Sequence, residues 1–265
     1  MITRNSNIGH APGAVIYTGK KDRDLFIELI DFSKSKLIET TGKTVEECFQ
    51  HRDTATTTWI NVNGLSNVEE IIKLGNHFGL HPLIVEDIAN TQQRPKIDEY
   101  DNYIFVVFKM LYYDPTGKLV IEHISLVLGE NYVLTFQESD GDVFDNTRMR
   151  LKKAKGIIRS CGSDYLLYTL LDAIVDNYFL IIERMGEKIE LLEDEIFETK
   201  DEAVIQKIQN LKKEALKIRR SIFPLREVVS KLEKSESTLI RHKTINYYKD
   251  LYDHTIQVIE HSFWI

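Results

Sequence analysis

Hydrophobic and polar positions follow two different patterns along this chain of 265 residues. Up to residue 162, short apolar runs alternate with helix-like segments and turn residues, which is typical of a layered α+β domain. From residue 163 onward, apolar residues recur at steps of three and four, which predicts long helices. We therefore predict two domains: an α/β/α domain with a mixed sheet over residues 1–162, and a stalk of long helices over residues 163–265.

The strand predictions rest on apolar runs that are bounded by turn residues. Residues 103–108 (YIFVVF) are continuously aromatic or β-branched, as a strand buried on both faces requires. The Asp-Pro-Thr-Gly sequence at residues 114–117 predicts a hairpin turn between this strand and the next. The other runs predicted to be strand-like are residues 14–18, 25–30, 58–62, 119–127 and 132–136.

Two short helices are predicted in the first part of the chain. Residues 68–78 place apolar side chains at helical spacing, with Ser66 as the predicted N-cap and Glu69 as its capping-box partner. Pro82 suits the first turn of a second, acidic helix, and Pro95 cannot lie inside it.

Longer helices are predicted in the second part. Apolar residues at steps of three and four over residues 164–196 and 204–222 predict two long helices, joined by a polar turn at residues 198–202. Pro224 is expected to kink or break the second of them. A third helix is expected to start near Thr244 and to run to the end of the chain without a stop signal.

Composition excludes some classes of protein and partner. The formal net charge of −7 argues against a nucleic-acid-binding face and favours cations as ligands. The two cysteines form no C-x-x-C pair, which indicates a reducing compartment. No signal peptide is visible, and no continuous apolar run reaches the roughly 20 residues that span a bilayer as a helix. We therefore predict no membrane-spanning segment within the chain.

Acidic residues at helical spacing are the main candidates for binding chemistry. Asp250, Asp253 and His254 are spaced i, i+3 and i+4, so they share one helix face and can hold a divalent cation. Asp172 and Asp176 form an i, i+4 pair whose mutual repulsion a cation would relieve. A solvated acidic face is the alternative interpretation of both groups, and the spacing alone does not decide between the two.

A third acidic pair lies in the short helix after Pro82. Glu86 and Asp87 are adjacent, so their side chains point about 100° apart around a helix of 3.6 residues per turn. At most one of the two can therefore face a given site directly.

Five segments of the chain strongly resemble the cytoplasmic domain of the CorA family of magnesium transporters, and they occur in the family's order. The first and longest is HPLIVEDIANTQQRPKIDEYDNYIFVVFKM, residues 81–110. The others are GDVFD at 141–145, DYLLYTLLDAIVDNYF at 164–179, PLREVVS at 224–230 and YYKDLYDHTIQ at 247–257. Nearly the whole chain is covered, so the resemblance implies the fold and the function of that domain.

The resemblance also implies a set of metal-binding residues. In the family, regulatory divalent cations bind between neighbouring subunits of a homopentamer. The matching positions imply that Asp87 of one subunit faces Asp250 of the next, with Glu86, Asp172 and His254 nearby as secondary or water-mediated ligands. Oxygen ligands with water completing the shell suit Mg²⁺, for which Co²⁺ or Ca²⁺ can substitute.

The family carries two membrane helices after the last of these segments. This chain ends at Ile265, and its final HSFWI departs from the family's pattern. We therefore expect a soluble, cytoplasmic portion of a longer inner (plasma) membrane protein, attached to the membrane through helices that the chain lacks.

The predicted function is that of a magnesium-sensing and gating domain. It would regulate a CorA-type channel or transporter of divalent cations, with magnesium as the expected cargo and cobalt as another. The equivalent domain of a zinc transporter of the same superfamily is the alternative. A metal-dependent enzyme is a weaker one, since the sequence has no P-loop, GxGxxG, GxSxG or zinc-protease signature, and we expect no catalysis. A plain coiled-coil scaffold would not explain the α/β part.

Overall fold

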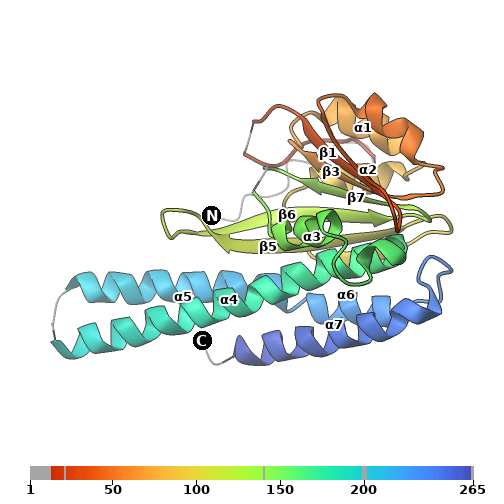
Figure 1. Ribbon diagram of the computed structural model, residues 1–265. Coiled ribbons are helices and arrows are strands. Elements are labelled where there is room, and N and C mark those ends of the chain that lie inside the picture. The colour runs from red at the N-terminus through yellow and green to blue at the C-terminus, as the bar shows by residue number, and fades with distance from the viewer. Residues whose placement is uncertain (1–12, 21, 140, 199–201, 264–265) are drawn as a thin grey trace.

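A computed structural model describes residues 13–20, 22–139, 141–198 and 202–263. Figure 1 shows a twisted sheet with a layer of short helices above it and a layer of long helices below it. The α/β/α layering with a mixed sheet and long helices, predicted from the sequence, is therefore confirmed.

The sheet has seven strands in the order β2-β1-β3-β7-β6-β5-β4. Neighbouring strands are antiparallel except for β3 and β7, which pair in parallel and make the sheet mixed. The strands are β1 (Phe26–Phe32), β2 (Leu37–Gly42), β3 (Thr57–Asn63), β4 (Lys96–Glu99), β5 (Ile104–Tyr113), β6 (Leu119–Leu128) and β7 (Tyr132–Gln137).

Most of the strand predictions are confirmed. Five of the predicted runs became β1, β3, β5, β6 and β7, and the 114–117 turn joins β5 to β6 as expected. Asp114 holds that turn, because its Oδ1 accepts hydrogen bonds from the backbone N–H groups of Thr116 and Lys118. The short edge strands β2 and β4 were not predicted, since neither carries a continuous apolar run.

The prediction of a strand at residues 14–18 is wrong. This segment lies along α2 (Pro82–Ala89) instead of entering the sheet, and the Thr18 N–H donates to the Ala89 carbonyl. Apolar side chains at Val15 and Tyr17 pack on the core between α2 and the sheet. The apolar side chains of this segment are partly buried, and they pack without strand pairing.

The helices form two groups, one on each face of the sheet. Above the sheet lie α1 (Val68–His77) and α2, with a 3₁₀ turn at Val45–His51. On the opposite face lie α3 (Asp145–Lys152), a 3₁₀ turn at Ile158–Ser160, and the helices α4 (Ser163–Glu198), α5 (Glu202–Ile222), α6 (Leu225–Glu233) and α7 (His242–His261). Most of the predicted polar turn, residues 199–201, lies outside the described residues.

Helix ends follow some of the predictions and contradict others. Pro82 is in the first turn of α2, and Pro224 separates α5 from α6, both as expected. The predicted Ser66–Glu69 capping box is wrong: Asn67 is the N-cap of α1, and the Ser66 hydroxyl donates to the Arg23 carbonyl. The prediction that the last helix has no stop is also wrong, because α7 ends at His261.

The sheet separates two apolar cores. Alternate residues of β5 enter one core or the other: Ile104, Val106 and Phe108 pack with α4, α6 and α7, whereas Phe105 and Val107 pack with α1 and α2. All five are fully buried, so the prediction of a strand buried on both faces is confirmed. The core below the sheet joins the two parts of the chain on either side of residue 162, and the division into two domains stays a prediction.

Helix α4 is apolar enough, over residues Ser163–Ile196, to match a membrane span by length and composition. The sequence-based search for continuous apolar runs did not find it, because Asp172 and Asp176 interrupt the run. Of the most apolar 18-residue window of this helix, 67% is buried inside the molecule. A core helix of a soluble domain meets the same criterion, and the packing of α4 against the sheet and α7 is of that kind.

Candidate metal site

The candidate site lies between α4 and α7, which are joined at their first turns. The Asp164 carboxylate on α4 is fully buried and accepts hydrogen bonds from the Thr244 hydroxyl at 2.6 Å and from the Arg241 backbone N–H at 3.1 Å. The Tyr248 hydroxyl donates to the Asp164 carbonyl at 2.8 Å. One buried carboxylate therefore caps the start of the neighbouring helix and sets the register between the two.

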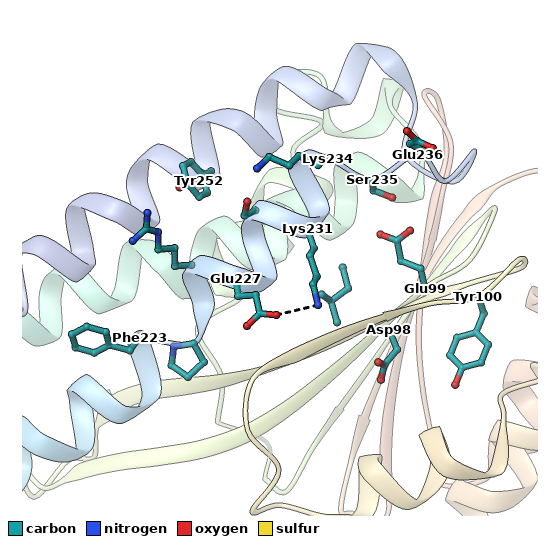
Figure 2. A pocket seen from close by; sticks show the side chains of 14 residues that line it. Asp98, Glu99, Tyr100, Phe223, Glu227, Lys231, Lys234, Ser235, Glu236 and Tyr252 are labelled. Carbon is teal, nitrogen blue, oxygen red and sulfur yellow. Dashed lines mark ion pairs between the residues drawn. The ribbon is translucent and has the colours of Figure 1, made fainter.

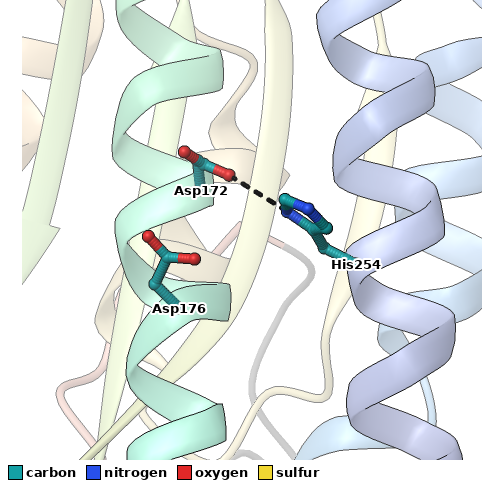
Figure 3. A group of neighbouring side chains, drawn as sticks. All are labelled: Asp172, Asp176 and His254. Carbon is teal, nitrogen blue, oxygen red and sulfur yellow. Dashed lines mark ion pairs between the residues drawn. The ribbon is translucent and has the colours of Figure 1, made fainter.

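Two turns further along, this register brings three ligand-type side chains together. Asp172 and Asp176 lie on successive turns of α4, and His254 projects toward them from α7 (Figure 3). One ligand atom from each side chain lies within 4.8 Å of the other two, and His254 Nδ1 is 3.7 Å from Asp172 Oδ1. The Asp172–Asp176 pair and His254, which the sequence presented in two separate patterns, are thus one cluster.

Two atoms of this cluster are buried without a hydrogen-bond partner among the described residues. They are Asp172 Oδ1 and His254 Nδ1, which face each other at a distance longer than a hydrogen bond. Leaving a buried polar atom unpaired typically costs about 1–3 kcal/mol. A bound cation, with its water, would satisfy both atoms.

Charge and burial act in the same direction at this cluster. Burial, together with the neighbouring charges of Asp176 and Asp250, raises the pKa of Asp172 to about 6, against the opposing effect of His254. Burial and the charge of Asp250 also raise the pKa of Asp176, again against His254. The cluster therefore holds more carboxylate charge than its own imidazole offsets, which favours binding of an external cation.

Asp250 lies at the outer margin of the cluster. Its Oδ1 is 4.0 Å from His254 Nε2, one helical turn away, and its side chain is 57% exposed. The exposure leaves this carboxylate accessible to a second molecule. Asp253 is exposed on α7 and does not belong to the group of three, although the sequence pattern had placed it with Asp250 and His254.

Glu86 and Asp87 form a separate group on α2, above the sheet. Glu86 accepts a hydrogen bond from the Gly13 backbone N–H at 2.9 Å. Asp87 is bound on both oxygens: Gln93 Nε2 donates to Oδ1 at 2.5 Å, and Lys96 Nζ donates to Oδ2 at 2.6 Å. Within one chain, the predicted site residues therefore fall into two groups on opposite sides of the sheet (Figure 1).

The environment of Asp87 is also short of positive charge. Burial, and the charges of Asp98 and Glu86, raise its pKa even though the bonded Lys96 acts against them. Burial lowers the pKa of Lys96, but its bonds to Asp87 and Asp98 outweigh burial and raise it overall.

The donor set fits a hard divalent cation. Carboxylate oxygens with water completing the shell suit Mg²⁺, and a single imidazole is also compatible with Co²⁺ or Zn²⁺. Among the described residues, the group of ligand-type side chains at this site includes no cysteine. Cys48 lies in the core above the sheet, where burial raises its pKa to about 12. The sequence analysis paired Asp176 with Asp172 but did not place it beside His254, because the spacing within one helix does not encode a contact with another.

Residues 54–263 match the sequence model of a family described as "CorA-like Mg2+ transporter protein", which is more than half of the chain. The "Cobalt/magnesium transport protein CorA" of Thermotoga maritima is 42% identical over 253 residues, which cover 95% of this chain and 72% of that protein. The "Putative metal ion transporter YfjQ" of Bacillus subtilis is 27% identical over 202 residues, which cover 76% of this chain and 62% of that protein.

Solved structures show the same fold. The soluble domain of CorA from Methanocaldococcus jannaschii is similar with a TM-score of 0.71 at 23% identity, covering 90% of this chain and 91% of that one. The ZntB cytoplasmic domain from Vibrio parahaemolyticus is similar with a TM-score of 0.72 at 15% identity, covering 91% and 92%. The resemblance predicted from five sequence segments is confirmed, and the chain belongs to the CorA family of divalent cation transporters.

Proposed function

We propose that this chain is the cytoplasmic magnesium-sensing and gating part of a CorA-family transporter of the inner (plasma) membrane. Regulatory Mg²⁺ ions bind between copies of the chain, which assemble as a pentamer in the full-length protein. The membrane helices are contributed by sequence outside the 265 residues. The relative from Thermotoga maritima, whose name includes cobalt and magnesium transport, supports these ions as the cargo.

The observation that carries this proposal is the cluster of Asp172, Asp176 and His254. It combines two carboxylates, two buried atoms without a hydrogen-bond partner among the described residues, and a carboxyl pKa raised by burial. Each of these features costs free energy in the absence of a cation. A bound divalent ion would remove all three costs at once.

The exposed carboxylate of Asp250 supports a role for a second copy. Asp87 of one copy and Asp250 of the next are proposed to share an ion, with Glu86, Asp172 and His254 as water-mediated or secondary ligands. When Mg²⁺ is abundant, bridged carboxylates hold the copies in a closed ring. When Mg²⁺ is scarce, unpaired carboxylates repel each other and the ring loosens.

No covalent chemistry is involved in this proposal. The switch works only because the ion binds the closed arrangement more tightly than the open one, so that its binding energy shifts the equilibrium between them. The long helices α4 and α7 carry the change toward the membrane part.

A zinc transporter with the same fold is the second candidate. The ZntB cytoplasmic domain shares the architecture, so the fold does not discriminate between the two ions. The observation in favour of zinc is the imidazole of His254, whereas the carboxylate majority of the cluster favours Mg²⁺, with Co²⁺ or Ca²⁺ able to substitute. A binding competition between millimolar Mg²⁺ and micromolar Zn²⁺ would distinguish the two candidates. Occupation of the site by Zn²⁺ under these conditions would favour the zinc transporter.

The test is the mass and the protease resistance of the chain with and without about 1 mM Mg²⁺, a concentration in the range at which weak oxygen-ligand sites fill. We expect Mg²⁺ to increase assembly of the wild type and to have no such effect on assembly of the Asp87→Asn/Asp250→Asn double variant. Protection by an ion bound at Asp172, Asp176 and His254 can persist in that variant, because it keeps all three side chains.

The matched control is the Asp53→Asn/Asp194→Asn double variant. It changes the net charge by the same amount at two exposed aspartates outside both groups. This control should respond to Mg²⁺ as the wild type does. An equal response of all three proteins would contradict the placement of the sites at Asp87 and Asp250.

A further inference from the structure

We propose that Lys96 is a built-in competitor of the regulatory cation. In this role its ammonium group occupies the position beside Asp87 until a divalent ion displaces it, and it thereby sets the affinity and the charge selectivity of the site. The inference rests on the proposed function, which makes Asp87 a ligand of the regulatory ion.

The geometry of Lys96 is that of a tethered cation between two carboxylates. Its Nζ is 2.6 Å from Asp87 Oδ2 and 2.6 Å from Asp98 Oδ2. Asp87 comes from α2, whereas Lys96 and Asp98 are two residues apart on β4 and therefore share one face of that strand. The ammonium thus occupies Asp87 Oδ2, while Gln93 Nε2 donates to Oδ1, so an ion that binds Oδ2 directly has to displace Lys96.

The ammonium group of Lys96 also has an aromatic neighbour. Its Nζ lies 5.5 Å from the centroid of the Phe105 ring, on the strand paired with β4. Its side chain is 31% exposed, so the ammonium is partly screened from water without being enclosed. A partly exposed ion pair of this kind can be broken by a competing ion, unlike a fully buried one.

Asp98 provides the displaced ammonium with another partner. Its side chain is 38% exposed and lines a groove of about 1120 Å³ between the edge strand β4 and helix α6. Figure 2 shows Asp98 on the strand side of this groove, with Lys231 and Glu227 across from it on α6. Lys96 can therefore keep one carboxylate bond, on the solvent side, after it releases Asp87.

Selectivity follows from the charges. A monovalent ion has the same charge as the ammonium group, so its attraction to Asp87 is no stronger. The ammonium is also tethered to the chain next to Asp87, which gives it a high effective concentration that a free ion lacks. A divalent ion brings one additional positive charge to a group in which two carboxylates share one lysine. Lys96 therefore excludes Na⁺ and K⁺ and weakens Mg²⁺ binding, so that the site responds only when Mg²⁺ is abundant.

The test is a titration with MgCl₂ of the wild type and of the Lys96→Met variant, which keeps the apolar stem and removes the charge. Protease protection and sedimentation are the readouts. We expect the variant to reach half-maximal response at about a fivefold lower Mg²⁺ concentration, the factor that a partly exposed ion pair typically contributes to an equilibrium. K⁺ at high concentration should also compete more strongly with Mg²⁺ in the variant.

Two further variants separate competition from general effects. Lys152→Met removes a positive charge and an ion pair with Glu39 on the distant edge strand β2, and it should leave the Mg²⁺ midpoint unchanged. The double variant Asp87→Asn/Lys96→Met should behave like Asp87→Asn alone, because a competitor has no effect where its target is absent.

The outcomes distinguish this inference from the proposed function. If the wild type responds to Mg²⁺ and Lys96→Met has the same or a higher midpoint, Lys96 is no competitor and the sensing role stands. If only Lys96→Met responds, the lysine masks the site completely, which supports the inference. If neither protein responds while both remain folded by circular dichroism, the sensing role is overturned and the inference with it.

Discussion

At the scale of single residues, the main result is an unbalanced group of ionisable side chains. Asp172 is partly buried, with its Oδ1 atom buried, and this atom faces an imidazole nitrogen of His254 that it does not reach by a hydrogen bond. The second carboxylate, Asp176, is exposed. A purely structural pair would be expected to close to hydrogen-bond distance, because unpaired buried atoms destabilise the fold. The open distance between these two atoms is the feature that the proposed cation would explain.

The raised pKa of Asp172 predicts how stability changes with pH. Its folded-state pKa of about 6 lies above its ordinary 3.8, so between these values the folded chain binds more protons than the unfolded chain. Stability from this group is therefore complete below about pH 3.8 and is lost as pH rises through about 6, by at most roughly 3 kcal/mol in total. Urea unfolding in EDTA at pH 4 and pH 7 measures most of this change.

The Asp172→Asn variant provides the comparison. Without a divalent ion at pH 7, we expect it to be more stable than the wild type by about 1–2 kcal/mol, and to show a flatter pH dependence between pH 4 and pH 7. In excess Mg²⁺ the order should reverse, because only the wild type gains stability from the ion. A variant less stable than the wild type in EDTA at pH 7 would contradict the assignment.

At the scale of helices and strands, the register between α4 and α7 decides whether the site exists. The register is set at one end by the buried Asp164, which accepts hydrogen bonds from the first turn of α7. Aromatic contacts of Tyr165 and Tyr168 with Tyr247 continue the packing toward the cluster. His254 meets Asp172 only because the two helices are aligned in this way.

Weakening this anchor should affect the distant site. Thr244→Val keeps the shape of the side chain but leaves the Asp164 carboxylate short of one hydrogen bond, which we expect to cost about 1–3 kcal/mol of unfolding free energy. We also expect faster amide hydrogen exchange in the first turns of α7 and a higher Mg²⁺ midpoint for protease protection.

Thr255→Val is the matched control on the same helix. Its hydroxyl is buried but donates only to the Leu251 carbonyl, one turn back in α7. It should leave the Asp164 anchor and the Mg²⁺ midpoint unchanged. Equal shifts in the two variants would mean that loss of any buried threonine hydroxyl on α7, and not the anchor, alters the site.

At the scale of the whole molecule, the sheet keeps the two acidic groups apart. Asp87 lies above it with α2, and the Asp172 cluster lies below it with α4 and α7. An ion shared by Asp87 and Asp250 would therefore be expected to require a second copy of the chain. The cluster of Asp172, Asp176 and His254, in contrast, is complete within one copy.

This difference predicts a dependence on protein concentration. If the regulatory ions bridge copies, the Mg²⁺ midpoint for protease protection should fall as the protein concentration rises, because binding and assembly are coupled. Mg²⁺ titrations followed by protease protection and sedimentation, at three protein concentrations between about 1 and 100 μM, check this prediction. Over these two decades of concentration, a midpoint that is coupled to assembly shifts measurably. A midpoint that does not change with concentration would place the ion inside a single copy, at the cluster of α4 and α7.

Much of this architecture could be predicted from the local sequence. Residues 103–108 became a doubly buried strand because every one of them is apolar, and the long helices followed from steps of three and four. Prolines marked the start of α2 and the break before α6. In each case a single local cause, such as side-chain period or a missing N–H group, determined the result.

The tertiary structure alone decided which side chains meet. Residues 14–18 have an apolar pattern that fits a strand, yet they pack on α2, because burial does not specify the partner. Asp176 joined His254, and Lys96 joined Asp87, through contacts between elements that local periodicity does not encode. The sequence by itself determined the elements and the types of candidate ligand. The packing of α4 on α7, and the ion pair between Asp87 on α2 and Lys96 on β4, determined which of these side chains lie together.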